Sequence, residues 1–406
     1  MLIDPSGIRV AGRLEPFAVG FAAELARQGY RRSSADSQLH LMAHLSRWLE
    51  AEGFDVHQFG ATEVERFVDI RRAEGYTKYL TSKALRPLLT YLRELGVAPP
   101  PPPPSPNGPV EVALERYRHY LTVERGLASA SARAYVDAVR PFVRGRLSPD
   151  GRELDLGQLK LADVTAFVVA RCPHQNRGAA QQTVTALRSL LGFLHLEGTI
   201  ERGLSTAVPT VAAWRLAGLP RGLEPTQVRS LLASCDRRTP RGRRDFAILT
   251  TLVRLGLRAA EVAALDLDDI VWRTGEMIVH GKGNRAECLP LPVDVGEAIA
   301  AYLRCGRPSS AQGRTVFVRL IAPHCALGRG GVQHVVVDAA RRAGLEPIRP
   351  HRLRHTAATQ MLRAGASLPE IGQLLRHRHI STTAIYAKVD REALRTLARP
   401  WPGGVA

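Results

Sequence analysis

The chain has 406 residues, 45% of them hydrophobic, so two or three folded domains are expected rather than one. Its 56 Lys+Arg outnumber its 38 Asp+Glu, and the formal net charge of +18 indicates a polyanionic partner. No apolar run approaches the ~18 residues that span a bilayer, and the start does not read as a secretory signal. These features exclude a membrane protein, and we expect a cytoplasmic, nucleoid-associated one.

The five cysteines lie far apart and form no CxxC pair, so the sequence predicts neither a zinc site nor a disulfide framework. We expect reduced, mostly buried thiols. Lysine is also rare, because nearly every other basic residue is arginine. The lysines are Lys78, Lys83, Lys160, Lys282 and Lys388.

A proline run, Pro99 to Pro104, marks a domain boundary. Consecutive prolines cannot form the interior of a helix or sheet, so residues 99–109 are expected to form a stiff polyproline II linker. Residues 1–98 before it and residues 110–200 after it are predicted to be helical domains. Residues 220–398 form the last domain.

The two helical domains have a similar layout, which indicates a duplicated four-helix module. Each contains an amphipathic stretch, a turn with Gly29 or Gly126, and a closing row of leucines. The closing rows are Leu85, Leu88, Leu89 and Leu92 before Gly96, and Leu187, Leu190, Leu191 and Leu194 before Gly198. Further matches are Leu39, Leu45 and Leu49 with Tyr135, Val139 and Val143, and Val64 and Phe67 with Val164 and Phe167. Two unrelated bundles with similar apolar periods are the alternative.

The last domain mixes helices and strands. The pattern predicts a helix over residues 244–265 and a β-hairpin over residues 276–291 with its tip at His280 to Arg285. Helices are predicted over residues 331–343 and 351–363, and a short one begins at Ser367, which has capping-box spacing with Glu370. The expected fold class is mainly α with a small β-sheet, an α+β domain preceded by helical domains.

Three short stretches of the last domain concentrate polar residues in apolar surroundings. The first, Leu255 to Val262, contains Arg258. In the second, Pro350 to Thr356, His351 and Arg354 lie three apart and therefore on one helical face. The third, Leu375 to Tyr386, contains His377 and ends in the tyrosine.

In this order the three stretches resemble the signature of the tyrosine recombinase, or phage integrase, family. The resemblance covers residues 220–395 as catalytic domain, and residues 110–200 look like the core-binding domain of the family. It implies a site-specific recombinase that cleaves and rejoins DNA through a 3′-phosphotyrosine intermediate, without metal, ATP or cofactor. The biological task would be integration, excision or transposition of a mobile element, or DNA resolution.

The resemblance assigns a role to each candidate catalytic residue. Tyr386 would be the nucleophile, Arg258 and Arg354 the phosphate clamps, His351 and His377 the acid/base and orienting groups, and Lys282 the hairpin lysine that protonates the leaving oxygen. Guanidinium groups bind the non-bridging phosphate oxygens bidentately as their charge grows. Tyrosine, with an ordinary pKa of ~10, needs a base, for which His351 is the candidate. Lysine can release a proton that arginine hardly can.

The implied partners are double-stranded DNA and a homo-tetramer on paired sites, or related recombinase subunits, with no membrane and no small-molecule substrate. Two departures from the family pattern, Arg352 and Arg376, are expected to affect DNA contacts rather than catalysis. Residues 1–98 are hypothesised to be a third DNA-contacting or arm-site domain. Two other functions stay open: a type IB topoisomerase-like enzyme, and a catalytically silent DNA-binding regulator.

Overall fold

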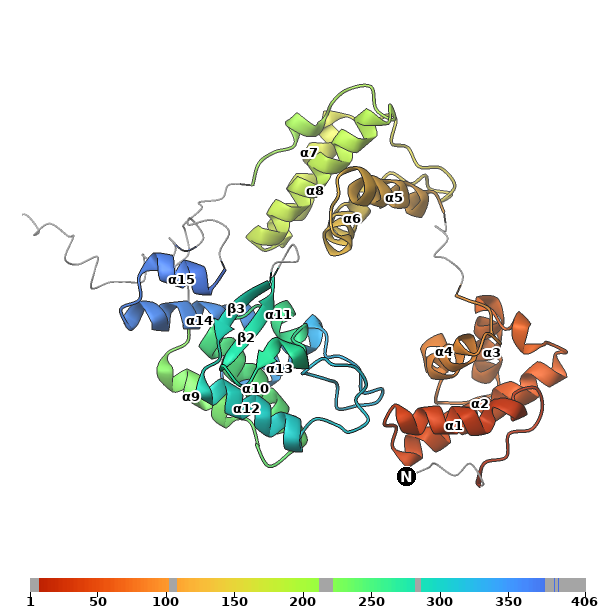
Figure 1. Ribbon diagram of the computed structural model, residues 1–406. Coiled ribbons are helices and arrows are strands. Elements are labelled where there is room, and N and C mark those ends of the chain that lie inside the picture. Colours follow the sequence, from red (N-terminus) through yellow and green to blue (C-terminus); the bar gives the residue numbers. More distant parts are fainter. Residues whose placement is uncertain are drawn as a thin grey trace, which may run out of the picture. The chain divides into compact units, whose positions relative to one another are not determined.

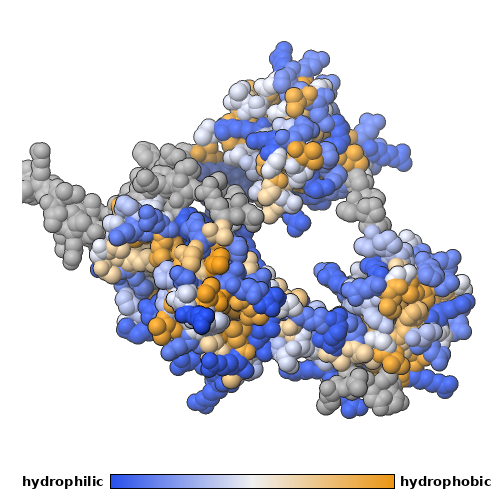
Figure 2. All heavy atoms as spheres, viewed as in Figure 1, coloured by the Kyte–Doolittle hydropathy of each residue, from blue (hydrophilic) through white to orange (hydrophobic). Residues whose placement is uncertain are grey.

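The computed structural model describes residues 7–101, 108–211, 222–281 and 286–376, together with Thr383 and Tyr386. The chain divides into two compact units, one of Met1–Pro101 with Gly218–Ala406 and one of Pro102–Ala217. Helices dominate both units, and the described residues contain one three-stranded sheet (Figure 1). The predicted fold class, mainly α with a small sheet, is confirmed. On the face that Figure 2 shows, hydrophilic residues cover most of each part of the chain.

Residues 7–98 form a bundle of four α-helices. The helices are α1 (Ala18–Arg27), α2 (Arg32–Ala51), α3 (Ala61–Ala73) and α4 (Arg86–Glu94). Their apolar faces share one hydrophobic cluster, in which Phe21, Leu39 and Phe59 are completely buried. The turn between α1 and α2 contains Gly29 at φ 82°, a left-handed conformation that favours glycine.

Residues 108–211 repeat this plan. The helices are α5 (Pro109–His119), α6 (Ser129–Arg144), α7 (Leu161–Arg171) and α8 (Arg177–Leu196). A single π-helical turn, Tyr120–Glu124, continues α5 up to Gly126, whose φ is 60°. These helices enclose a hydrophobic cluster of their own.

The remaining elements form the α+β part of the chain. The helices are α9 (Pro225–Ala233), α10 (Pro240–Leu255), α11 (Ala259–Ala263), α12 (Val293–Cys305), α13 (Arg329–Arg342), α14 (Pro350–Arg363) and α15 (Leu368–Leu374). The strands are β1 (Ile270–Val271), β2 (Glu276–His280) and β3 (Ala286–Pro290), in antiparallel order β1-β2-β3. The predicted hairpin is therefore confirmed, with Met277 opposite Leu289. Helix α10 lies at the centre of the core, because 11 of its residues are buried.

The helix predicted over residues 244–265 is wrong in one respect, because it is two helices. Gly256 ends α10 in the left-handed conformation (φ 58°), and Arg258 then stands at the N-cap of α11. A left-handed glycine is a common helix end, and here it turns the chain sharply between two apolar segments. Arg258 is therefore placed at a helix start rather than inside a helix.

Two smaller predictions can also be compared with the structure. The capping box at the start of α15 is confirmed, since Glu370 accepts a hydrogen bond from the backbone N–H of Ser367 (2.7 Å) and donates its own N–H to Ser367 Oγ (3.4 Å). The cysteines are free thiols, but the prediction that most of them are buried is wrong. Cys235 is buried, whereas Cys288, Cys305 and Cys325 are exposed. Over the ranges that the structure describes, no helix is long and apolar enough to cross a membrane.

Candidate active site

Arg354, one of the candidate catalytic cations that the structure describes, is buried, with 3% of its surface exposed. It lies on the second turn of α14. Its Nη1 donates to the carbonyl of Gly256 (2.7 Å), and its Nη2 donates to the carbonyl of Leu375. Burial, followed by the charge of Arg258, lowers the pKa of Arg354 to about 10, so the guanidinium stays charged near neutral pH. Two of its five N–H groups hold the fold together, which leaves three for a ligand.

Arg258 is held by a buried carboxylate, Glu261. Glu261 accepts hydrogen bonds from the backbone N–H of Arg258 (2.7 Å) and from its Nη1 (2.6 Å). The side chain of Arg258 remains 46% exposed, so part of it stays accessible to a ligand. Arg354 interacts electrostatically with Arg258 and with the hydroxyl group of Tyr386 when it ionises, so these three residues share one neighbourhood.

Arg376 binds the same carboxylate from the other side. Its Nη2 lies 2.6 Å from Glu261, and both side chains are 4% exposed. Burial raises the pKa of Glu261, but the bonds from Arg258 and the charge of Arg376 outweigh it, so the pKa lies below its ordinary value. In this arrangement the side chain of Arg376 is buried in an ion pair, so its expected effect on DNA contacts stays a prediction.

Tyr386 is 1% exposed and packs in a small cluster with Ala358, Ile371 and Leu375. Its phenol oxygen lies 2.8 Å from Nδ1 of His355, and the two ring centroids are 5.6 Å apart. Burial raises the pKa of Tyr386, and the charge of Arg354 partly offsets this effect. The side chain is therefore a neutral phenol near neutral pH, and its proton can be donated to His355.

Two histidines of α14 lie next to each other in this neighbourhood, since the ring centroids of His351 and His355 are 4.3 Å apart. Partial burial lowers the pKa of His351, and the charges of Arg354 and Arg258 lower it further. The side chain still has an exposed part. Burial, followed by the charges of His351 and Arg354, lowers the pKa of His355 to about 4. Both rings are neutral near neutral pH and can accept a proton.

The structure thus brings together Arg258, His351, Arg354 and Tyr386, which come from three separate sequence stretches. The other two candidates, Lys282 and His377, lie outside the described residues. Within the described ranges, no group of three or more His, Cys, Asp or Glu side chains could hold a metal ion. The available chemistry is a phenol nucleophile, neutral imidazoles and two fixed guanidinium groups, a set suited to phosphoryl transfer by positioning and charge.

Two residues of this site were not predicted as catalytic. His355 was not among the candidate catalytic residues, yet its Nδ1 lies within hydrogen-bond distance of the phenol oxygen of Tyr386. The sequence signal for His355 was weak. It follows Arg354 directly on α14, and successive side chains of a helix point about 100° apart, so the two need not face the same site. The position of residue 386 relative to α14 is not encoded locally. Glu261 could have been found from its capping-box spacing to Arg258.

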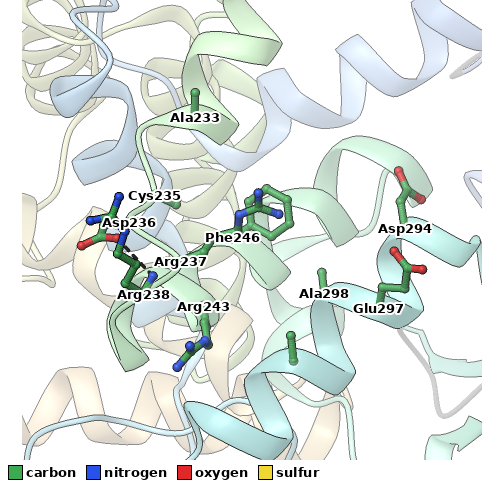
Figure 3. Close-up of a pocket in the computed structure, with 11 residues that line it drawn as sticks. Ala233, Cys235, Asp236, Arg237, Arg238, Arg243, Phe246, Asp294, Glu297 and Ala298 are labelled. Carbon is green, nitrogen blue, oxygen red and sulfur yellow. Dashed lines mark hydrogen bonds between the residues drawn. The ribbon is translucent and has the colours of Figure 1, made fainter.

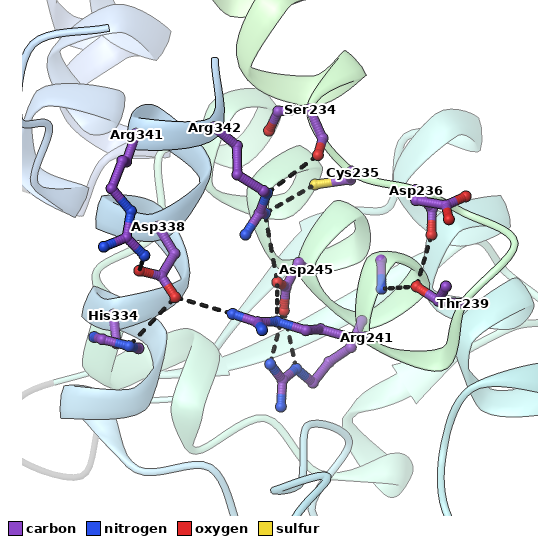
Figure 4. Close-up of polar contacts among 12 residues, drawn as sticks. Ser234, Cys235, Asp236, Thr239, Arg241, Asp245, His334, Asp338, Arg341 and Arg342 are labelled. Atoms are coloured by element: carbon purple, nitrogen blue, oxygen red, sulfur yellow. Dashed lines mark hydrogen bonds and ion pairs between the residues drawn. The ribbon is translucent and has the colours of Figure 1, made fainter. Parts of the chain in front are cut away.

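Two other polar features of the same unit lie apart from these residues. A cavity of about 900 Å³ has Arg237, Arg238 and Arg243 on one side and Asp294 and Glu297 of α12 on another, and none of the candidate residues lines it (Figure 3). An ion-pair network joins α10 to α13 (Figure 4). Its centres are two buried carboxylates, Asp245 and Asp338, surrounded by Arg241, Arg244, Arg341, Arg342 and His334.

Known families and proteins match this chain over most of its length. The phage integrase family matches residues 221–393, and the phage integrase N-terminal SAM-like domain matches residues 114–198. A putative integrase/recombinase, y4rA, of Sinorhizobium fredii is 41% identical over 97% of this chain and 95% of its own length. The tyrosine recombinase XerD of Listeria monocytogenes is 32% identical over 70% of this chain and 95% of its own length.

Solved structures show the same fold. The XerH site-specific recombinase in a post-cleavage complex with its palindromic difH substrate aligns with a TM-score of 0.55 at 16% identity, over 82% of this chain and 93% of that chain. A lambda integrase dimer bound to a COC′ core site aligns with a TM-score of 0.54 at 17% identity, over 72% and 79%. The recombinase names of the relatives fit strand exchange and not the topoisomerase-like or silent-regulator alternatives. The chain therefore belongs to the phage integrase family of tyrosine recombinases, enzymes that cleave and rejoin DNA.

Proposed function

We propose that Tyr386 attacks a DNA phosphodiester held by Arg258 and Arg354 and forms a 3′-phosphotyrosine bond. The observation that carries the proposal is the placement of the phenol oxygen of Tyr386 beside His355, close enough to Arg354 for the charge of that guanidinium to act on the phenol. The free N–H groups of the two arginines would bind the non-bridging oxygens as their charge grows. Lys282 would protonate the leaving 5′ oxygen, and His377 would assist at the phosphate.

The proton of the phenol has two candidate acceptors. His355 lies at hydrogen-bond distance, and His351 is its neighbour on the same helix. Both imidazoles are weak bases in the free protein because burial and the surrounding positive charge lower their pKa values. A DNA phosphate bound between the arginines adds negative charge and raises both pKa values. Bound substrate thus makes the histidines better bases.

Tyr386 must also move before it reacts. Its 1% exposure leaves no room for a phosphate next to the phenol oxygen. The described arrangement therefore corresponds to a resting state, and DNA binding or assembly would release the phenol from the cluster of Ala358, Ile371 and Leu375. The energy required is modest for one ring, on the order of 1.5–3 kcal/mol for a buried apolar side chain, and phosphate contacts can supply it.

The test is covalent trapping on a nicked duplex that carries a binding site selected from random DNA. Cleavage next to the nick releases the short strand, so the protein–DNA adduct accumulates and is resolved on a denaturing gel. The Tyr386→Phe variant should form no adduct. The matched control is Tyr302→Phe, which removes the hydroxyl of another completely buried tyrosine in the same unit. An adduct formed by Tyr386→Phe at the wild-type rate would refute the assignment.

We further propose that the active assembly is a homo-tetramer on two paired sites, acting on DNA in the cytoplasm during integration, excision or transposition of a mobile element, or during DNA resolution. A lambda integrase tetramer bound to a Holliday junction is among the similar solved structures, which supports this stoichiometry. Sedimentation of the protein with two site-length duplexes should give a complex of four protomers. A complex that stays at two protomers with one duplex, while adducts still form, would limit the protein to cleavage without synapsis.

A further inference from the structure

Residues 7–98 and residues 108–211 share the order of their helices and many of their core positions. The segment from Phe54 to Val68 aligns with Leu154 to Val168 without a gap, and equivalent side chains share the core. The equivalent pairs are Val56 and Leu156, Phe59 and Leu159, Val64 and Val164, Phe67 and Phe167, and Val68 and Val168. The family matches cover residues 114–198 and 221–393, so residues 7–98 lie outside both.

The correspondence extends to the first and last helices of each bundle. Phe21 of α1 contacts Tyr91 of α4 with ring centroids 5.5 Å apart, and Tyr117 of α5 contacts Phe193 of α8 at the same distance. The closing leucines predicted from the sequence are buried in both modules. In α2 and α6 the buried positions match in a slightly different register from the one predicted. They are Ala35, Leu39, Met42 and Leu45 in α2, and Ala132, Val136, Val139 and Phe142 in α6.

Backbone details are repeated as well. The residue before α3, Gly60, donates its N–H to Glu63 (3.0 Å), and the residue before α7, Lys160, donates its N–H to Asp163 (2.9 Å). Each final helix ends at a left-handed glycine, Gly96 or Gly198. Shared core positions, aromatic contacts, helix starts and helix ends together indicate two copies of one module. Two unrelated bundles would not be expected to share all four of these features.

The surfaces of the two copies have diverged while their overall charges remain similar. Residues 7–98 hold 13 Lys+Arg against 11 Asp+Glu, and residues 108–211 hold 13 against 10. In the register of the buried residues, His40 and His44 of α2 are replaced in α6 by Asp137 and Pro141, while Arg47 is matched by Arg144. A diverged surface on a retained core is expected when the second copy contacts a different stretch of its ligand.

One face of residues 7–98 is suited to bind the phosphate backbone of DNA, and we call it the α2 face. It consists of His40, His44 and Arg47 on α2 with Arg71, Tyr76 and Lys78 beside them. The ring of Tyr76 contacts His44 edge-on at 5.2 Å and covers the guanidinium of Arg71 at 4.1 Å, while Arg71 donates to the carbonyl of Lys78 (3.2 Å).

The charges of this face act on one another. The pKa of His44 is lowered by burial and by the charges of Arg47, Arg71 and His40, with Glu74 as the opposing neighbour. Arg47 and Lys78 are exposed, and no ion pair with an acidic side chain is found for either among the described residues. By contrast, Arg66 and Arg72 of the same module are paired with Glu52 and Asp69. The unpaired cations of the α2 face are therefore available for phosphates.

We propose that residues 7–98 are a second core-binding-type module that binds duplex DNA through the α2 face, next to the segment bound by residues 108–211. This inference rests on the proposed function, because it assumes that residues 108–211 bind DNA. Arg47 and Lys78 contact phosphates, and Tyr76 with His44 supplies hydrogen-bond groups beside them. Such contacts position a protein on DNA and make its affinity dependent on salt. Each protomer then covers a longer site than two domains alone would.

The experiment uses the full-length chain with the single variants Arg47→Gln and Lys78→Gln and their double variant. Arg66→Gln is the matched control, because it removes the same charge from an exposed, ion-paired arginine of the same module. Binding to a long duplex carrying the selected site is measured against salt concentration, and protection from hydroxyl radicals is mapped. Each test variant should reduce the slope of log K against log salt by about 1 and weaken protection in an outlying segment of the site. Arg66→Gln should change neither.

Adduct formation at Tyr386, measured on the same proteins, separates this inference from the function on which it rests. If adducts form and the test variants keep the slope and footprint of Arg66→Gln, the inference is overturned and the recombinase assignment stands. The inference is also overturned if the test variants change the sedimentation of the protein with no change in the footprint, since the α2 face would then bind protein. Circular dichroism confirms that each surface variant is folded.

Discussion

Arg354 combines a structural and a chemical task in one side chain, because two of its N–H groups bind carbonyls from two different turns of the chain. Arg354→Lys keeps a charge, but one ammonium cannot reach both carbonyls and a phosphate in the same geometry. We expect adduct formation in single-turnover measurements to slow by about 10²–10³-fold, the usual loss for one preorganised donor. The control is Arg363→Lys, an exposed cation on the same helix, 3.4 Å from Glu224. A rate for Arg354→Lys within tenfold of wild type would contradict this role.

His355 makes the stability of its unit depend on pH. Its pKa is lowered to about 4 in the folded protein, whereas an unfolded histidine titrates near ~6.5. Between these values the unfolded state binds more protons, so the free energy of unfolding falls as the pH decreases from about 6.5 to about 4. In the His355→Gln variant, the part of this decrease in the free energy of unfolding that is due to His355 should disappear. The measurement is chemical denaturation at several pH values, and an equally steep profile in the variant would show that His355 does not contribute.

The sequence predicted which residues come together in the candidate active site, but not the hydrogen bonds that position their side chains. Arg258, His351, Arg354 and Tyr386 could be predicted because the family signature identifies them in order. The bonds from Arg354 to Gly256 and Leu375, and the contact of His355 with Tyr386, join positions between 21 and 98 residues apart. Such contacts depend on the packing of α14 against α10 and α15, which no local pattern encodes.

Helices α10 and α13 are connected by buried charges as well as by apolar contacts. Asp245 is 1% exposed and accepts from Arg244 at 2.8 Å, with Arg241 and Arg342 each at 3.6 Å (Figure 4). Asp245→Asn removes the negative charge that compensates the buried Arg244, whose side chain is 10% exposed, and breaking such a buried pair costs about 3–5 kcal/mol. Urea unfolding should show this loss. Asp294→Asn, which breaks an exposed ion pair with Arg254, should cost at most about 1 kcal/mol.

The elements themselves were predicted to different extents. The hairpin, helix α14 and the start of α15 follow local rules of alternation, periodicity and capping, and the structure confirms them. The break between α10 and α11 could not be predicted from periodicity, because Leu255, Leu257 and Val262 continue the apolar pattern across it. Gly256 was the only local signal, and glycine is required there because the backbone is left-handed and because a Cβ atom would lie 2.6 Å from Leu375.

On the scale of the whole molecule, the hydrophobic residues form separate clusters in residues 10–98, 110–211 and 223–353. No hydrophobic residue belongs to more than one of these three clusters, so each is stabilised mainly by its own burial. The unit Pro102–Ala217 should therefore unfold as a separate cooperative transition.

The Tyr117→Ala variant tests this independence. Tyr117 is completely buried, contacts Phe193 and bonds the carbonyl of Ala186 (3.2 Å), so its truncation should cost about 3–5 kcal/mol. Hydrogen exchange measured peptide by peptide should show that protection falls in residues 108–211 and stays at the wild-type level in residues 222–376. If protection falls equally in both ranges, the two units are one cooperative structure, and a DNA contact made by either module would then be felt directly at Arg354.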